Sequence, residues 1–271
     1  LNCRIVNNTA YGTGGIRCLQ GAQPTIQDCL IKGNVATGDD GGGLSLFINA
    51  DVELIRTHVA NNNATGRGAG IFVKDSNLQA SDCTIHLNNS SSNGGGVGFQ
   101  SSTGTMSGCE IFDNDSGNSG GGMSVIDSDP IFTDCVIREN NCDPGGGGGV
   151  WLENLANPIF VNCIISDNTV PNDAGGGIYV NNSTASLDGC LVSNNIASEG
   201  VGGVYFVNGG SGSLLDTIVC SNQIGQIGNA WTDLGGNLIS ENCPVPTVFT
   251  VALDGSGDFT SIQSAIDAAA S

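Results

Sequence analysis

The chain has 271 residues, of which 43 are Gly, only 7 are Pro and 39% are hydrophobic; Gly is about twice as frequent as in an average protein, and no Gly-X-Y period indicates collagen. Seven Lys and Arg against 26 Asp and Glu give a net charge of −19, which excludes nucleic acid as a partner because binding a phosphate backbone needs the opposite sign. No apolar run approaches the ~18 residues of a membrane-spanning helix, so we expect no membrane span.

From Cys3 onward, one sequence frame recurs nine times at intervals of 26 to 28 residues. Each repeat begins at Cys or Thr and carries Ile or Val two positions later and Asn five positions later, without exception. The first residues of the repeats are Cys3, Cys29, Thr57, Cys83, Cys109, Cys135, Cys163, Cys190 and Thr217. Repetition at this length, in short segments separated by polar turns, is typical of the coils of a parallel β-helix.

A second frame within each repeat places Gly before an aliphatic residue or Met, with another apolar residue two positions later, as in Gly70-Ile71-Phe72-Val73. Alternation with a period of two predicts a strand with one buried face. A weaker apolar segment at residues 77–80 lies between this strand and the next Cys. We therefore predict an all-β solenoid, a parallel β-helix of about nine coils with three short strands in each coil.

Neighbouring coils of a β-helix lie ~4.8 Å apart, so equivalent side chains stack in columns. We expect the Ile and Val side chains to form a dry core, the Asn amides to bond to one another and to the turn backbone, and the Cys of the repeats to act as small hydrophobes. Parallel, in-register Cys side chains are unsuited to disulfides. Cys220 and Cys243 lie outside this column and are the one pair that we expect to form a disulfide.

Residues 1–243 resemble the pectin-lyase-like superfamily of secreted right-handed parallel β-helices. The Gly-Gly-Ile/Val/Leu element with its later Asn is similar to the repeats of bacterial polymorphic outer-membrane proteins. The resemblance implies a right-handed solenoid. It does not extend to the motifs of polygalacturonase-type hydrolases, since only Asp39-Asp40 matches and no His-Gly or Arg-x-Lys element is present. The resemblance is therefore specific for the fold and not for an activity.

The repeat frame decays after Asn222, and Cys243-Pro244-Val245-Pro246 is typical of a linker. Residues 248–271 predict a strand, a Gly turn and a short helix, and they resemble the opening segment of pectin methylesterases, in which the helix caps the first coil. We expect an N-terminally truncated β-helix over 1–243, a linker over 244–247, and the start of a second, truncated β-helix domain over 248–271. The chain would then continue into a larger polypeptide.

Basic side chains gather on the outward side of the Cys-led strands: Lys32, Arg56, His58, His86 and Arg138. Carboxylates among them are the candidate metal ligands Asp82, Glu110 and Asp134. Cleavage of an acidic polysaccharide by elimination needs a cation or calcium beside the uronate carboxylate and a base for the C5 proton. The basic residues are thus the candidate catalytic set, with calcium as the cofactor to consider. Alternatively, these charges only keep an exposed sheet soluble and block edge pairing.

Aromatic side chains recur at one outward position of the Gly-led strands, at Trp151, Tyr179 and Tyr205 on three consecutive coils. A strip of this kind can bind sugar rings through face-on contact, and exposed apolar patches tend to mark interaction sites. The alternatives are a ladder of rings that pack on one another, or a strip covered by the loops at 154–157 and 208–213.

We expect a non-catalytic β-helix module that contacts a glycan or a protein in the manner of an adhesin, without a required cofactor. The acidic, Lys-poor composition suits an exported bacterial surface protein, so an extracellular or outer cell-surface location is expected. Two alternatives stay open: a polysaccharide lyase or hydrolase that acts on an acidic polysaccharide, and a purely structural spacer in a tandem array.

Overall fold

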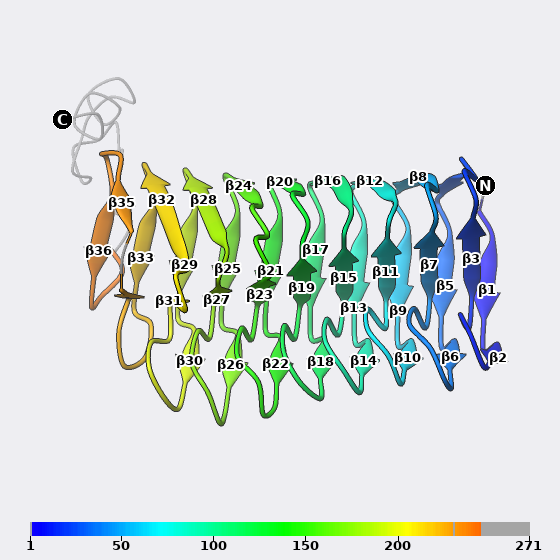
Figure 1. The fold of residues 1–271 in the computed structure, drawn as a ribbon, viewed down its shortest axis with the longest axis horizontal. Coiled ribbons are helices and arrows are strands. Elements are labelled where there is room, and N and C mark those ends of the chain that lie inside the picture. The colour runs from blue at the N-terminus through cyan, green and yellow to red at the C-terminus, as the bar shows by residue number, and fades with distance from the viewer. Residues whose placement is uncertain (1, 230, 245–271) are drawn as a thin grey trace, which may run out of the picture. The chain divides into compact units, whose positions relative to one another are not determined.

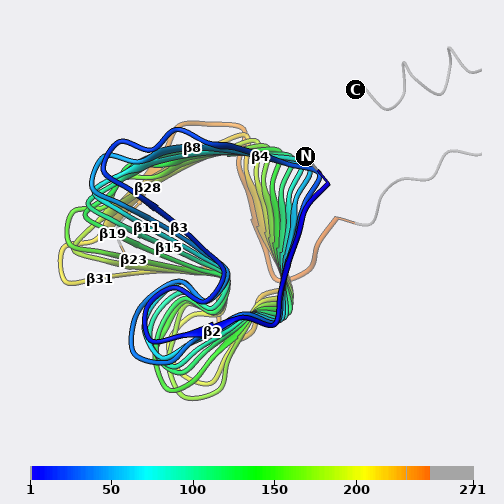
Figure 2. The same ribbon diagram turned by 90° about the vertical axis from the view of Figure 1, so that its right-hand side faces the viewer.

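The computed structural model describes residues 2–229 and 231–244. These residues form a parallel β-helix of about nine coils whose strands run along four sides, as Figures 1 and 2 show. Every strand pairs in parallel with its equivalents in the neighbouring coils, the first and last strand of each sheet with one and the others with two, so each β-sheet extends along the solenoid axis. The predicted fold class and the approximate number of coils are confirmed.

The four sheets are named here A to D in the order in which the first coil enters them. Sheet A consists of β1 (Arg4–Val6), β5 (Leu30–Lys32), β9 (His58–Ala60), β13 (Thr84–His86), β17 (Glu110–Phe112), β21 (Val136–Arg138), β25 (Ile164–Ser166), β29 (Leu191–Ser193), β33 (Ile218–Cys220) and β36 (Leu238–Ser240). Sheet B consists of β2 (Thr9–Ala10), β6 (Val35–Ala36), β10 (Asn63–Ala64), β14 (Asn89–Ser90), β18 (Asp115–Ser116), β22 (Asn141–Cys142), β26 (Thr169–Val170) and β30 (Ile196–Ala197).

The Gly-led strands form sheet C: β3 (Ile16–Leu19), β7 (Leu44–Phe47), β11 (Ile71–Lys74), β15 (Val97–Gln100), β19 (Met123–Ile126), β23 (Val150–Glu153), β27 (Ile178–Asn181), β31 (Val204–Val207) and β34 (Ile227–Gly228). Sheet D consists of β4 (Thr25–Gln27), β8 (Asp51–Ile55), β12 (Asn77–Ser81), β16 (Thr103–Ser107), β20 (Ile131–Thr133), β24 (Ile159–Val161), β28 (Thr184–Asp188), β32 (Ser211–Leu215) and β35 (Thr232–Asp233).

The expectation of three strands per coil is wrong, because sheet B adds a fourth. Its strands have only two residues each and begin directly after the repeated Asn, as in Asn63–Ala64. Two residues are too short to show the alternation by which a strand is recognised in a sequence. Only the pairing with equivalent residues in neighbouring coils reveals them.

The core consists of columns of aliphatic side chains that point into the coil. Ile85, Ile111 and Ile137 are fully buried and stack in register along sheet A. Residues from sheets C and D complete one continuous hydrophobic cluster that includes Phe99, Phe132, Phe160 and Phe206. The predicted inward columns are therefore confirmed.

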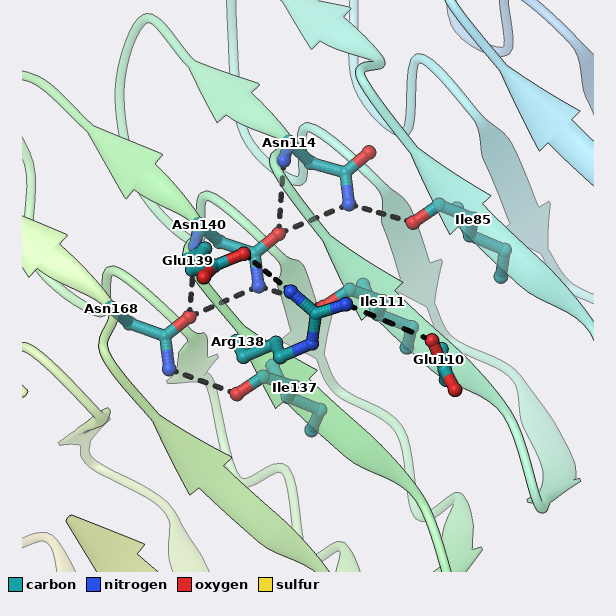
Figure 3. A network of polar contacts seen from close by, with 9 residues as sticks. All are labelled: Ile85, Glu110, Ile111, Asn114, Ile137, Arg138, Glu139, Asn140 and Asn168. Carbon is teal, nitrogen blue, oxygen red and sulfur yellow. Dashed lines mark hydrogen bonds and ion pairs between the residues drawn. The ribbon is translucent and has the colours of Figure 1, made fainter.

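The Asn column forms an unbroken hydrogen-bonded ladder at the corner between sheets A and B. The Asn114 Nδ2 donates to the Ile85 carbonyl (2.9 Å) and to Asn140 Oδ1 (3.0 Å), and the same pattern continues to Asn168 (Figure 3). At the end of the ladder, Gln226 Oε1 accepts from both the backbone and the side-chain nitrogen of Asn222. The amides thus satisfy backbone groups that the turn buries, as the sequence predicted.

The Cys column at the corner between sheets D and A forms hydrogen bonds, and is therefore more than a column of small hydrophobes. The Cys29 thiol donates to the carbonyl two residues earlier (3.1 Å), and the Cys29 N–H donates to the Thr57 hydroxyl (3.3 Å). Thr57 in turn donates to the Ile55 carbonyl (3.0 Å). Thr can replace Cys in this column because its hydroxyl makes the same two bonds.

Cys220 and Cys243 are both disulfide-bonded, whereas none of the other nine cysteines takes part in a disulfide. Nothing in the part of the chain that the structure describes forms a helix long and apolar enough to cross a membrane. The expected linker and the expected second-domain segment at 248–271 lie, apart from Pro244, outside the described residues.

Candidate functional site

The basic candidates lie on the outer face of sheet A but do not converge on one point. Lys32, His86 and Arg138 occupy one outward column, in register with Ala60 and Phe112 between them. His58 lies in the other outward column of the sheet, beside Leu30 and Thr84. Arg56 is at the corner before the sheet, where its backbone has a positive φ of 42°. The candidates are therefore distributed over several coils.

Both arginines of the candidate catalytic set are held by carboxylates. The Arg56 guanidinium forms a bidentate pair with Asp28, with Nε–Oδ1 at 2.9 Å and Nη2–Oδ2 at 3.1 Å. This pairing lowers the pKa of the Asp28 carboxyl, chiefly through the hydrogen bond. Arg138 contacts Glu139 and Glu110, the latter at 3.8 Å (Figure 3). A uronate carboxylate would therefore compete with these intramolecular partners for either guanidinium.

On the same face of sheet A, His86 belongs to a stack with the Phe112 ring and the Arg138 guanidinium. The imidazole lies parallel to the Phe112 ring, with 4.9 Å between centroids, and the Arg138 guanidinium lies over that ring at 4.3 Å. Burial first, and then the positive charge of His58, lower the pKa of His86. The protonated imidazole is therefore disfavoured, which fits a packed surface stack.

The three carboxylates considered as metal ligands are far apart. Asp82 and Asp134 lie at the corner before sheet A, two coils apart, with Gly108 in the coil between them. Glu110 lies within β17 and faces Arg138. Within the described ranges, no group of three or more His, Cys, Asp or Glu side chains is arranged to hold a metal ion.

Trp151, Tyr179 and Tyr205 stack in register on β23, β27 and β31 and are half-buried. The Trp151 and Tyr179 rings are nearly parallel, at 19°, with centroids 4.5 Å apart, which is close to the coil spacing. Tyr205 then meets Tyr179 edge to face, at 71° and 5.5 Å. The inner ring faces are thus occupied by neighbouring rings, and this geometry matches a self-packed ladder.

Glycine residues contribute to the cover over these rings, while cover by the loops at 154–157 and 208–213 stays a prediction. Gly146 packs directly against the Tyr179 ring, while Gly200 and Gly228 pack against Tyr205. Gly146 and Gly200 belong to the loops that lead from sheet B into sheet C, and a side chain at Gly146 would collide with the Tyr179 ring. These Gly-rich loops therefore contribute to the burial of Tyr179 and Tyr205 on the outer face of sheet C.

A polar groove follows the corner between sheets C and D and encloses about 570 Å³. Three columns line it over four consecutive coils. One wall is Asn49, Asp75, Ser101 and Asp127, the floor is Ala50, Ser76, Ser102 and Ser128, and the other wall is Asp51, Asn77, Thr103 and Asp129. Four of these side chains are carboxylates, and none of the twelve is basic or aromatic.

The backbone of the corner explains why these residue types stand there. Asn49, Asp75, Ser101 and Asp127 all have φ between 48° and 57°, and Asn and Asp adopt this left-handed conformation more readily than other side chains. The next residue in each coil has a buried side chain. In one coil it is Ser102, whose hydroxyl donates to the Gln100 carbonyl (2.7 Å) and accepts from the Ser76 N–H (3.2 Å). The corner is therefore a hydrogen-bonded Ser ladder with polar side chains on both sides.

Hydrogen bonds between neighbouring coils hold the groove walls in place. Asn77 Nδ2 donates to Asp51 Oδ1 (2.7 Å), and the Thr103 hydroxyl donates to Asn77 Oδ1 (3.1 Å). On the opposite wall, the Ser101 hydroxyl donates to Asp127 Oδ2 (3.0 Å). The walls therefore present fixed rows of acceptors and donors along the solenoid axis.

Two smaller grooves of about 330 and 140 Å³ continue the same corner toward the C-terminal coils. The first shares Ser101 and Asp127 with the large groove, and both contain Leu155 and Asn182. We refer to the three grooves together as the corner groove. It extends from Asn49 to Gly209 along one side of the molecule.

Sequence reasoning did not identify the corner groove. Its signal is the set Ser76, Ser102 and Ser128, which recurs every 26 residues with a polar residue on each side. The residues of each wall vary among Asn, Asp, Ser and Thr, so no single residue type marks the repeat. Neither their type nor their spacing shows that the corner is hollowed.

The match to a protein-family model agrees with the architecture. The chain is similar to the crystal structure of pectate lyase Pel9A, with 13% sequence identity, a TM-score of 0.39, and coverage of 90% of this chain and 76% of that one. No curated protein sequence matches it. The model of the family described as right handed beta helix region matches residues 40–187 and 116–230, which together span more than half of the chain. This protein is therefore a member of the right-handed β-helix family.

Proposed function

We propose that this protein is a non-catalytic carbohydrate-binding module that holds a neutral, hydroxyl-rich glycan in the corner groove. The observation that carries the proposal is the set of parallel polar columns, which repeat at the coil spacing of ~4.8 Å. A linear polymer of similar units, lying along the axis, meets an equivalent pair of side chains on each coil. Sugar hydroxyls both donate and accept, as the mixed carboxylate, amide and hydroxyl lining requires.

Charge selects against acidic polysaccharides. The twelve residues of the large groove include four carboxylates and no Lys or Arg, and the whole chain carries a net charge of −19. A polyuronate would bring its own carboxylates beside those of the groove, where like charges repel. A neutral glycan meets no such repulsion, and its hydroxyls donate hydrogen bonds to the carboxylate oxygens.

The lyase alternative is less well supported, because Arg56 and Arg138 are already paired with Asp28, Glu110 and Glu139. Aromatic binding of sugar rings at Trp151 stays a prediction, although stacking on Tyr179 occupies one face of the ring. We also propose an extracellular or outer cell-surface location, on the acidic and Lys-poor composition.

Affinity electrophoresis tests the proposal. The full chain is run through native gels that contain hydroxyethylcellulose, galactomannan or polygalacturonate. We expect at least one neutral polymer to retard the protein and polygalacturonate not to retard it. The variant Thr103→Val/Asp127→Gly removes one polar group from each wall, and Gly accepts the positive φ at position 127. It should lose at least five-fold in retardation.

The matched control is Asn63→Ala/Asn89→Ala, which removes two exposed polar side chains from the outer face of sheet B. It should migrate like the wild type in every gel. Equal retardation of the groove variant and the wild type, or no retardation by any neutral polymer, contradicts the proposal. Release of unsaturated sugars from polygalacturonate would favour the lyase alternative instead.

A further inference from the structure

Leu155 is an apolar side chain in an exposed and sterically unfavourable position. It is 74% exposed, and its backbone has a φ of 65°. Left-handed backbone is uncommon for any residue other than Gly, Asn or Asp, because the β-carbon approaches the backbone carbonyl. Neither burial of the side chain nor an easy backbone conformation accounts for a Leu at this position.

The corner between sheets C and D is turned by one left-handed residue in some coils and by two in others. The residue at each place of the turn can therefore be compared between coils of the same kind. Single left-handed residues turn the corner at Asp75, Ser101, Asp127 and Asn182. Pairs of left-handed residues turn it at Gln20-Gly21, Ile48-Asn49, Asn154-Leu155 and Asn208-Gly209. In the second place of the pair, two coils have Gly and one has Asn, which adopt this backbone readily. Leu155 is the exception.

Leu155 also lies where the parts of the corner groove meet. It lines both smaller grooves, with Gln100 and Asp127 on one side and Thr184 and Gly209 on the other. Its polar neighbours in the two smaller grooves offer hydrogen bonds, and Leu155 is the exposed large apolar side chain in the lining of these two grooves. A sugar ring has both polar edges and an apolar carbon–hydrogen face, so a site for it needs a surface of each kind.

We infer that Leu155 is a ligand-contacting residue that receives the apolar face of one sugar ring, while the glycan runs parallel to the solenoid axis through the corner groove. The inference rests on the proposed function and specifies its ligand. From Asn49 to Asn208 the groove covers six coil steps, or roughly 29 Å. Affinity should therefore rise with the length of a neutral oligosaccharide until the ligand spans both Leu155 and the large groove.

The test compares Leu155→Gly with Leu87→Gly. Leu87 has the same features, with a φ of 55° and 49% exposure, but it lies at the corner between sheets A and B. Gly relieves the backbone at both positions, so neither variant should lower the melting temperature. We expect only Leu155→Gly to reduce retardation by the retained neutral polymer, by at least three-fold. Leu155→Met, which keeps an apolar side chain, should restore more than half of it.

The outcomes separate this inference from the proposed function. If Thr103→Val/Asp127→Gly abolishes retardation while Leu155→Gly migrates like the wild type, the groove binds glycan and the role of Leu155 is wrong. If Leu87→Gly weakens retardation as much as Leu155→Gly, the effect is not local and the inference fails. If the wild type is not retarded by any neutral polymer, the proposed function itself fails.

Discussion

Replacement of Asn114 by Ala should severely destabilise the solenoid. Asn114 is fully buried, and its Oδ1 accepts two hydrogen bonds from Asn88, one from the backbone N–H and one from Nδ2, both at 3.0 Å. Ala removes this acceptor and leaves two donors of a fully buried residue without their partner. Each unsatisfied buried group costs about 1–3 kcal/mol, so the free energy of unfolding should fall by about 2–6 kcal/mol.

The measurement is equilibrium urea unfolding of the full chain, followed by far-UV circular dichroism. Asn89→Ala is the control, because Asn89 is next to Asn88 in sequence but exposed on β14. Exposed substitutions of this kind change stability by no more than about 0.5 kcal/mol. A loss below about 1 kcal/mol for Asn114→Ala, or one equal to that of Asn89→Ala, would refute the view that the ladder satisfies buried backbone groups.

Three further predictions concern the Cys column, His86 and Trp151. Cys135→Thr should fold and melt within a few degrees of the wild type in a thermal scan, because Thr57 already makes the hydrogen bonds of this column; a collapse of the fold would show that sulfur is required. His58→Gln should raise the pKa of His86 in an NMR titration, since the charge of His58 lowers it; an unchanged pKa would contradict a contribution from His58. Because the pKa of His86 is lowered by folding, its protonation favours the unfolded state, so its contribution to stability is lost as the pH falls from the usual imidazole value through the lowered one. Trp151→Ala should lower the free energy of unfolding by about 2 kcal/mol, roughly half the cost at a fully buried site; an unchanged melting temperature would instead support an aromatic strip that is free to bind sugar.

The parts of the structure that the sequence predicted are those that repeat once per coil. Asn at a fixed offset specifies a column, and a column of buried amides must bond along the axis, as Asn88, Asn114 and Asn140 do. The strands of sheet B were missed since two residues show no alternation. For the same reason, the fourth side of the coil became visible only through strand pairing.

The candidate site shows where sequence reasoning stopped. The repeat register in the sequence correctly predicted that Trp151 and Tyr179 stack on adjacent coils. Only the orientation of the two ring planes, however, decides whether ring faces or ring edges are exposed to solvent. Likewise, the sequence places Arg56 and Asp28 one coil apart, while the bidentate contact depends on side-chain rotamers. A charge or ring can thus be assigned to a surface from the sequence without showing whether it is free to bind.

The sequence by itself determined the stacking direction: coils of 26 to 28 residues, with equivalent side chains in contact along the axis. This follows because each coil contacts mainly its two neighbours, so a one-dimensional repeat specifies most contacts. The tertiary structure alone decided how the sides of a coil are oriented and which surfaces its loops cover. Turn conformations, such as the left-handed residues at Asp75 and Leu155, shape the corner along which the groove runs. Those angles arise from local sterics that no periodic pattern records.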